Sequence, residues 1–291
     1  MNDWDDYRLV LALAREVTLR GTADALGVTH TTVSRRLAVL QDARGQLFER
    51  TASGYAPTAL GNAIIDVAEG MERLTFKSAR YRKAFTQELS GEVTLSLPEA
   101  IAQYLLLDDL FEFARMHPAI NLNIQTSYRY VDLDRSEADI VVRGAAEPPD
   151  HLVGRRLFPN CVTYFANRDY LANTPREDLT WIAPASDGPW PDWLETSPYP
   201  DAPVALVLDD ITARHRALVK GLGLGRGACF MADPEPNLIR LSTAAPVPQQ
   251  DIWVLTHPDL RETPRIRLVM DFIMSAMEQK RELVLGLTPT P

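Results

Sequence analysis

Residues 18–50 read TLRGTADALGVTHTTVSRRLAVLQDARGQLFER, and the function of the remaining chain depends on what this segment forms. Its pattern predicts two short helices joined by a tight turn. The first is expected over Gly21–Leu26, with Thr18 as its N-terminal cap and Gly27 as the left-handed residue that ends it. The second is expected to present one side outward.

The second helix is predicted to follow the capping residue Thr29 and to end near Asp42. Val33, Leu37 and Leu40 recur at the spacing of one helix face and form its buried stripe. The opposite side is small, polar and cationic. It carries Thr31, Ser34, Arg35 and Ala38, with His30 and Arg36 at its flanks.

This outward side has the chemistry of a DNA recognition helix. Small side chains let a helix sit deep in the major groove, hydroxyl groups bond to base edges or phosphates, and arginine can bind guanine through two hydrogen bonds. The alternative interpretation is an ordinary solvated helix face. Residues 51–58 contain the Gly and Pro of a tight hairpin, and such a wing would place Arg50 against the DNA backbone or minor groove. The candidate DNA-contacting residues are Thr18, Thr29, His30, Thr31, Thr32, Ser34, Arg35, Arg36 and Arg50.

A larger set of residues in the first sixty or so positions keeps a fixed mutual spacing. It consists of Thr18-Leu19, Ala23, Leu26-Gly27-Val28, Val33-Ser34-Arg35, Leu37, Leu40, Gly45, Leu47-Phe48, Arg50, Thr58 and Gly61. In this pattern Met1–Gly61 resembles the winged helix-turn-helix of the LysR-type transcriptional regulators. The resemblance implies a DNA-binding regulator with double-stranded operator or promoter DNA, a small-molecule effector and RNA polymerase as partners. It also implies a homodimer or homotetramer, without a cofactor and without membrane association.

The charge of the chain is distributed unevenly along its 291 residues. The first 90 residues hold 12 Lys and Arg against 11 Asp and Glu, a net charge of +1, and the remainder hold 18 against 28, a net charge of −10. The acidity therefore belongs to the C-terminal two-thirds. Because the N-terminal part is nearly neutral, we expect several copies to combine modest phosphate contacts, with a weak dependence of binding on salt.

The composition, 46% hydrophobic and 24% charged, is that of a globular protein with a substantial core. The acidic start MNDWDD has no basic segment followed by an apolar run, and no apolar segment is long enough for a membrane span, so we expect a cytoplasmic protein. Cys161 and Cys229 are isolated and are interpreted as buried small side chains. The five histidines are scattered, which predicts no metal site, and no G-x-S-x-G or S-x-x-K motif suggests an enzyme.

An apolar repeat begins after the predicted wing. Leucine, isoleucine, valine, methionine and aromatic residues alternate in steps of four and three residues, which predicts a coiled-coil linker helix over residues 59–89. The alternative is a helix that packs on its own globular domain. The repeat consists of Leu60, Ile64, Val67, Met71, Leu74, Ser78, Tyr81 and Phe85.

Residues 90–291 show the alternation of strands and helices that is typical of an α/β fold. Strands are expected at Val93–Leu97, Ile120–Thr126, Ala138–Arg143, Cys161–Ala166, Trp181–Ala183, Val204–Leu208, Leu224–Met231 and Ile252–Thr256, with helices at Tyr104–Met116, Asp210–Lys220 and Arg265–Glu282. We interpret them as two lobes of a periplasmic-binding-protein type. Residues 91–161 and 257–291 form the first lobe and 162–256 the second, and the chain crosses between them near Cys161–Phe165 and Ile252–His257.

The resemblance to the LysR family continues, through Ala138-Asp139-Ile140-Val141-Val142, Asn167-Arg168-Asp169-Tyr170-Leu171 and Leu218–Leu224. In sheets of this kind ligands bind beyond the carboxyl ends of strands. This rule predicts effector contacts at Pro98, Glu99, Ala100, Ser127, Tyr128, Arg143, Asp210 and Thr212. Glu99 could favour an amine-bearing ligand, although a solvated acid at a helix start is the alternative. Gly221–Gly227 follows a helix and precedes a strand, so it is interpreted as a helix-ending turn and not as a dinucleotide loop.

These observations predict a LysR-type regulator whose operator binding or DNA bending is modulated by an effector in the C-terminal cleft. The alternative from another class is a ligand-binding receptor whose N-terminal helices contact proteins; retention on DNA would separate the two. An enzyme would need a catalytic set of residues that the sequence does not contain.

Overall fold

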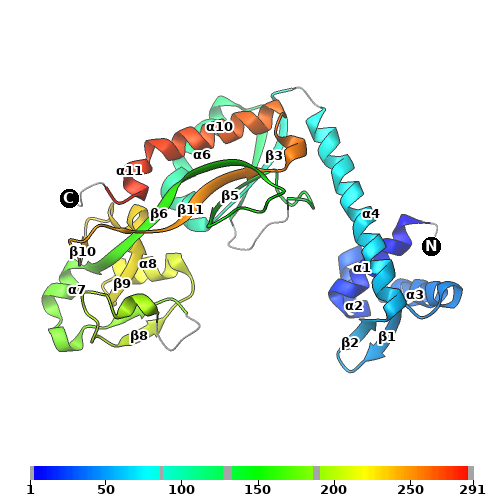
Figure 1. Ribbon diagram of the computed structural model, residues 1–291, viewed down its shortest axis with the longest axis horizontal. Helices are drawn as coiled ribbons and strands as arrows, with labels where there is room; N and C mark the ends of the chain where they lie inside the picture. Colours follow the sequence, from blue (N-terminus) through cyan, green and yellow to red (C-terminus); the bar gives the residue numbers. More distant parts are fainter. Residues whose placement is uncertain (1–2, 86–87, 127–132, 186–190, 288–291) are drawn as a thin grey trace. The chain divides into compact units, whose positions relative to one another are not determined.

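The computed structural model describes residues 3–85, 88–126, 133–185 and 191–287. The chain divides into two compact units, Met1–Arg82 with Asp134–Ser136, and Lys83–Leu133 with Glu137–Pro291 (Figure 1). Each unit has its own hydrophobic core. Among the described residues, no helix is both long and apolar enough to cross a membrane.

Three helices begin the N-terminal unit: α1 (Trp4–Glu16), α2 (Leu19–Leu26) and α3 (His30–Arg44). The hydroxyl of Thr18 accepts a hydrogen bond from the Gly21 amide, 3.1 Å away, so α2 begins two residues before the predicted Gly21. Gly27 ends α2 with a φ of 65°, as predicted. The predicted apolar stripe of α3 is buried and packs against α1 in one core. That core contains Leu9, Val10, Leu13, Ala23, Val33, Leu37, Leu40, Leu47 and Phe48.

The predicted wing is an antiparallel hairpin of β1 (Phe48–Thr51) and β2 (Gly54–Pro57). The Tyr55 amide donates a hydrogen bond to the carbonyl oxygen of Val17 at 2.8 Å, which joins the hairpin to the end of α1. Gly54 has a φ of 135°, and a β-carbon there would lie 2.4 Å from the same carbonyl oxygen. Only glycine allows the wing to approach α1 so closely.

A 26-residue helix, α4 (Ala59–Ala84), follows the wing. Thr58 caps it by accepting a hydrogen bond from the Gly61 amide at 3.0 Å. Two hydrogen bonds of 2.8 and 2.6 Å join the guanidinium of Arg15 on α1 to the carboxylate of Glu72. The Arg15 hydrogen bond lowers the pKa of Glu72 below its ordinary value, so this ion pair anchors α4 to α1 at neutral pH.

Two glycines of α4 allow a matched test of this packing. A β-carbon on Gly61 would lie 2.0 Å from the Leu47 carbonyl oxygen, whereas one on Gly70 would have only the Arg73 guanidinium within 4 Å, at 3.8 Å. We expect Gly61→Ala to destabilise the N-terminal unit by about 1–3 kcal/mol or more, because backbone must move. Gly70→Ala should stabilise it by about 0.5–1 kcal/mol, because alanine favours the helix. Urea unfolding of both variants checks this; equal effects would contradict the packing of Gly61 against Leu47.

The C-terminal unit contains a nine-stranded mixed sheet among its described residues, in the order β4-β3-β5-β11-β6-β9-β7-β8, with β10 paired to β6. The first lobe holds β3 (Gly91–Leu97), β4 (Ile120–Thr126) and β5 (Ile140–Ala145), which are mutually parallel. Its helices are α5 (Glu99–Ile101), the π-helical segment η1 (Ala102–Leu106), α6 (Leu107–Met116), η4 (Pro258–Leu260), α10 (Pro264–Gln279) and α11 (Arg281–Val284). Val93, Leu95 and Leu97 of β3 are fully buried, as expected of a central parallel strand.

The second lobe is built on the far half of β6 (Val153–Asn167). Its other elements are α7 (Arg168–Asn173), η2 (Arg176–Asp178), β7 (Trp181–Ala183), η3 (Asp192–Leu194), β8 (Val204–Val207), α8 (Ile211–Val219), β9 (Leu224–Ala228), α9 (Cys229–Ala232) and β10 (Leu238–Arg240). Trp181 and Leu224 lie at the centre of its main apolar cluster. The two-lobed α/β architecture agrees with the prediction.

Two long strands, β6 and β11 (Val247–Thr256), run through both lobes (Figure 1). Val162 of β6 pairs with Val247 on one side and with Ala228 of β9 on the other, so the chain crosses here. Ile252–Thr256 already pair with β5 of the first lobe. The return crossing therefore lies nearer Val247 than the predicted Ile252–His257, because β11 extends five residues before the apolar segment that the sequence pattern marked.

Three boundaries differ from the predictions for local reasons. The helix predicted from Tyr104 begins at Glu99, since Pro98 precedes it and its carbonyl oxygen accepts the Ala102 amide at 3.0 Å. The apolar segment Leu224–Met231 forms β9 and then α9, a case in which periodicity cannot separate a strand from a short buried helix. The glycine-rich segment after α8 is a helix-ending turn, as predicted, with a φ of 68° at Gly221.

Candidate DNA-binding surface and effector cavity

The outward side of α3 is exposed within the N-terminal unit. His30, Thr31, Ser34 and Arg35 are all exposed, whereas Val33 on the opposite side is fully buried. The helix is held through its apolar stripe, which leaves its polar side available to a partner. An exposed arginine among small hydroxyl residues can reach base edges in a major groove.

Other predicted DNA contacts have structural roles within the unit. Thr29 caps α3, and its hydroxyl lies 2.9 Å from that of Thr31 and 2.8 Å from that of Thr32. The Arg36 guanidinium donates to Asp6 of α1 at 3.0 Å and is half-buried. Thr29 and Arg36 therefore hold α3 in its orientation, whereas the Arg35 side chain is exposed on the outward side of this helix.

The wing carries a further exposed cation of the N-terminal unit. Arg50 is exposed on β1, where it pairs in register with Tyr55 of β2. Thr18 is also exposed, but its hydroxyl is the cap of α2. An exposed arginine on such a hairpin has the charge and reach to contact a phosphate group.

A cavity of about 320 Å³ lies between the two lobes of the C-terminal unit. The first lobe contributes residues after β3 and at the end of β5, and the second contributes the start of α8 and α9. The crossing strands β6 and β11 supply the remaining wall. The lining residues are Pro98, Ala100, Ile101, Arg143, Gly144, Asn160, Ile211, Phe230, Gln250 and Ile252.

Arg143 is the charged residue among the described residues of this lining and is buried, with 8% of its surface exposed. Its guanidinium donates to the Ser96 hydroxyl of β3 at 3.0 Å and to the Val142 carbonyl oxygen at 2.9 Å. The side-chain oxygen of Asn160 is buried and has no hydrogen-bond partner among the described residues. The cavity therefore combines apolar walls with a few fixed polar groups, as ligand sites usually do.

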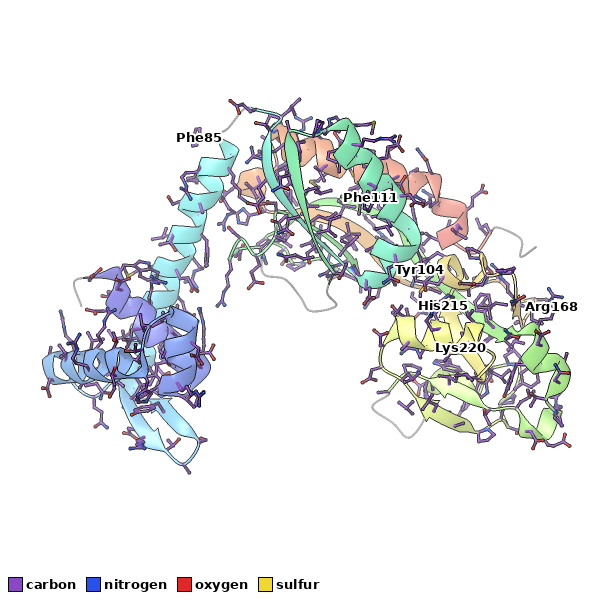
Figure 2. The ribbon with its side chains drawn as sticks, turned by 180° about the vertical axis from the view of Figure 1, so that it is seen from behind. Phe85, Tyr104, Phe111, Arg168, His215 and Lys220 are labelled. Atoms are coloured by element: carbon purple, nitrogen blue, oxygen red, sulfur yellow. The ribbon has the colours of Figure 1, made fainter. Side chains whose placement is uncertain are left out.

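The lobes also meet at His215 of α8 and Tyr104 of η1, which Figure 2 shows beside each other. Their rings are edge to face, with centroids 5.1 Å apart. His215 is buried, and its Nε2 lies 3.2 Å from a carboxylate oxygen of Glu235. Burial lowers the pKa of His215 below 6.5, while the hydrogen bond that the ring donates to Glu235 acts in the opposite direction.

This histidine predicts a pH dependence of stability. As the pH falls below 6.5, His215 becomes protonated in the unfolded chain but stays neutral in the folded one, because burial lowers its pKa there. The free energy of unfolding should therefore decrease with falling pH until the pH reaches the lowered pKa of the folded state. Tyr104, Glu235 and Arg216 face or influence the ring, and only Glu235 favours its protonation. We expect His215→Gln to lose less stability than the wild type between about pH 7.5 and 5.5. Thermal unfolding measures this, and parallel curves would exclude His215 as the cause.

Comparison with known proteins identifies the family. The family model described as "LysR substrate binding domain" matches residues 86–278, and that described as "Bacterial regulatory helix-turn-helix protein, lysR family" matches residues 4–62. The chain belongs to the LysR family. Its relatives are transcriptional regulators and not enzymes, so this LysR regulator is a DNA-binding protein with an effector-binding domain.

Individual relatives of the LysR regulator cover most of its length. It is 26% identical over 287 residues to the Mau operon transcriptional activator of Paracoccus denitrificans, which covers 93% of this chain and 95% of that protein. It is 22% identical over 283 residues to an HTH-type transcriptional repressor of Pseudomonas aeruginosa, covering 90% and 88%. The full-length virulence activator AphB of Vibrio cholerae has the same fold, with a TM-score of 0.57, 18% identity and coverage of 94% and 99%. These matches do not favour a receptor with protein-binding N-terminal helices.

The effector contacts predicted from sequence fall into three groups. Pro98, Ala100 and Arg143 line the cavity of the LysR regulator. Glu99 does not, because its carboxylate accepts a hydrogen bond from the Gln103 amide at 2.7 Å, so the argument for an amine-bearing ligand loses its basis. Ser127 and Tyr128 lie outside the described residues.

Asp210 and Thr212 flank the cavity residue Ile211 without lining the cavity themselves. Asp210 caps α8 by accepting the Ala213 amide at 2.6 Å. The Thr212 hydroxyl is buried and has no hydrogen-bond partner among the described residues. The topological rule located a helix start that borders the cavity, but the residue that faces the cavity is Ile211, which lies between the two residues that were predicted.

Sequence reasoning missed the cavity residues of the crossing strands and of α9. Asn160 directly precedes one apolar strand segment and Gln250 lies two residues before another, which is the signal that could have indicated them. Phe230 lies on the short helix that was predicted to be a strand. All three belong to elements whose extent depends on contacts between distant segments.

Proposed function

We propose that this regulator binds operator DNA with the outward side of α3 in the major groove and the wing against the backbone. The exposure of Thr31, Ser34 and Arg35, opposite a fully buried Val33, is the observation that supports this most directly. His30 extends the same exposed surface and Arg50 adds a phosphate contact from β1. Thr18, Thr29, Thr32 and Arg36 hold the surface in place and contribute to DNA binding through it.

We further propose that α4 pairs with α4 of a second copy. Apolar residues of its repeat are exposed in the single chain: the side chain of Val67 is 49% exposed and that of Leu74 is 66% exposed. A helix that stays unpaired would be expected to carry polar residues at such positions. Ile64, by contrast, packs against the core of the N-terminal unit. A stripe confined to the seam positions fits a two-stranded coiled coil, which would fix the distance between two α3 helices.

A second exposed apolar surface supports assembly beyond a dimer. Phe111, labelled in Figure 2, has 73% of its surface exposed, and further exposed apolar side chains lie on α6 and on the adjoining edge strand β4. A second copy of this chain is the occupant we propose, because the patch continues onto a sheet edge that a symmetric partner could cover. The patch consists of Leu107, Phe111, Met116 and Ile124.

The cavity between the lobes is proposed as the effector site. A ligand there would contact both lobes and both crossing strands, so it would favour one relative arrangement of the lobes over others. Allosteric control requires such a difference in affinity between two arrangements. We propose that this difference changes the spacing or angle of the paired α3 helices on DNA.

Footprinting on the region upstream of the regulator's own gene tests the proposal. We expect protection of two half-sites, with a boundary or a hypersensitive position that shifts when the correct metabolite is added. The same footprint and the same transcription with every metabolite tested would count against effector control. Absence of any salt-sensitive protected region would count against the DNA-binding proposal itself.

A further inference from the structure

The start of α10 contains a buried arginine with unsatisfied donors. Arg265 is the second residue of this helix, and only 4% of its surface is exposed. Its Nη2 donates to the carbonyl oxygen of Lys83 at 3.3 Å, whereas its Nε and Nη1 have no hydrogen-bond partner among the described residues. No carboxylate of the described residues forms an ion pair with it. Because burial of an unpaired cation is unfavourable, a negatively charged partner is expected.

The same helix start carries further donors. Thr263 precedes α10 as its N-terminal cap, but its hydroxyl forms no capping hydrogen bond. This side chain is 1% exposed, and its hydroxyl has no partner among the described residues. The amides of Arg265 and Ile266 likewise donate no hydrogen bond that is seen in the described part of the chain. Since the first turn is the positive end of the helix dipole, it adds to the charge of Arg265.

The acids of the neighbouring segments are bound to other groups. Asp139 accepts the Lys83 ammonium at 2.8 and 2.9 Å. It also accepts the Thr94 amide at 2.9 Å. Glu262 lies 3.5 Å from the guanidinium of Arg267. The buried donors at the start of α10 therefore lack a matching acceptor, which is the arrangement that an anion at a helix N-terminus satisfies.

The surroundings of Arg265 set the size of such an anion. A β-carbon on Gly91 of β3 would have one described atom within 4 Å, the Nε of Arg265 at 3.8 Å. Room for a small group therefore lies beside Nε. The almost complete burial of Arg265 and Thr263 excludes a bulky organic anion, because it could not contact both without moving the backbone.

We propose that the start of α10 binds a compact inorganic anion of the size of chloride. The anion lies at Nε of Arg265, with the Thr263 hydroxyl and the first-turn amides as further donors. Lys83 belongs to the last turn of α4, so the site adjoins the point where this helix ends. The bound charge offsets the cost of burying Arg265 and stabilises its contact with the end of α4.

Thermal unfolding of the full-length protein tests the site. Sodium chloride replaces sodium gluconate from about 1 to 300 mM at constant ionic strength, so that screening does not change. We expect the Tm to rise by about 3–6 °C with the logarithm of the chloride concentration. Bromide should act as chloride does, whereas the larger phosphate and sulfate should have smaller effects. In crystals grown with bromide, anomalous scattering should locate an ion within hydrogen-bond distance of Arg265 Nε.

Three variants assign the effect to the start of α10. Arg265→Met removes the charge at similar length, so it should abolish the chloride response and raise the Tm at the lowest chloride concentration. Thr263→Val keeps the shape and removes the hydroxyl, and should raise the Kd for chloride about 3- to 15-fold. Arg267→Met removes an exposed arginine from the same helix and is the matched control, with the response of the wild type.

A wild-type Tm that does not distinguish chloride from gluconate would overturn the proposal. An undiminished chloride response in Arg265→Met would do the same. If Arg265→Met does not fold, the response of Thr263→Val and the position of the bromide ion decide. Bromide found at Nε without any effect of chloride on the Tm would be an adventitious ion only, and the site would be rejected.

Discussion

Replacing Arg35 with alanine is expected to weaken operator binding about 5- to 150-fold, because a base contact through two hydrogen bonds contributes about 1–3 kcal/mol. The side chain is exposed on α3 and no intramolecular ion pair of Arg35 is seen among the described residues. Its removal should therefore leave the fold unchanged. Fluorescence anisotropy with labelled operator, at one fixed salt concentration, measures the change in Kd.

Arg36→Ala is the matched control for this prediction. It removes the same charge from the next position, but from a guanidinium that is half-buried and bound to Asp6. We expect a smaller loss of affinity from Arg36→Ala and a small loss of stability instead. Equal affinities for wild type and Arg35→Ala would remove Arg35 from the DNA interface. A lower Tm of Arg35→Ala would show that the residue supports the fold.

The N-terminal unit could be predicted closely from sequence because its signals are local. Thr18 and Thr29 cap their helices through amides three residues away, and Gly27 ends α2 through its own backbone conformation. The buried stripe of α3 follows from helical periodicity alone. Each of these features depends on residues within one or two turns of each other, so a linear pattern contains the information.

The cavity between the lobes could be predicted only in part, because six separate segments line it. Arg143 was found from the rule for strand ends, but the inward-facing Ile211 was not, since a capped helix start gives no sign of which neighbour faces the cavity. Glu99 was assigned to the effector because its partner Gln103 lies one helical turn away, in a part of the helix that the predicted Tyr104–Met116 did not include. Contacts between distant segments decided these positions.

The weak charge of the first 90 residues connects DNA binding to assembly. A net charge of +1 offers few phosphate contacts per copy, so a single winged helix-turn-helix should bind DNA poorly. Two copies joined by α4 would combine their contacts at one operator, which raises affinity without any new contact. The seam of α4 should therefore affect DNA binding as strongly as the recognition helix itself.

Leu74→Asp is accordingly expected to halve the number of subunits in the assembly and to weaken operator binding by about 100-fold or more. Leu74 is the most exposed aliphatic side chain of the seam, with 66% of its surface exposed, so the N-terminal unit does not need it for folding. Burial of Leu74 from each copy contributes about 1.5–3 kcal/mol per side chain to pairing. In the variant each copy instead places one negative charge at the same position of the coiled coil, and the two charges repel each other. Sedimentation velocity measures the assembly, and anisotropy measures the affinity for operator.

Asn62→Asp adds the same negative charge to the same helix at an exposed position away from the seam, and should preserve both assembly and affinity. If Leu74→Asp sediments as the wild type does, α4 is not the pairing element. If the assembly is halved but affinity is retained, one winged helix-turn-helix suffices for the operator, and the near-neutral N-terminal unit must bind DNA mainly through base contacts such as that proposed for Arg35.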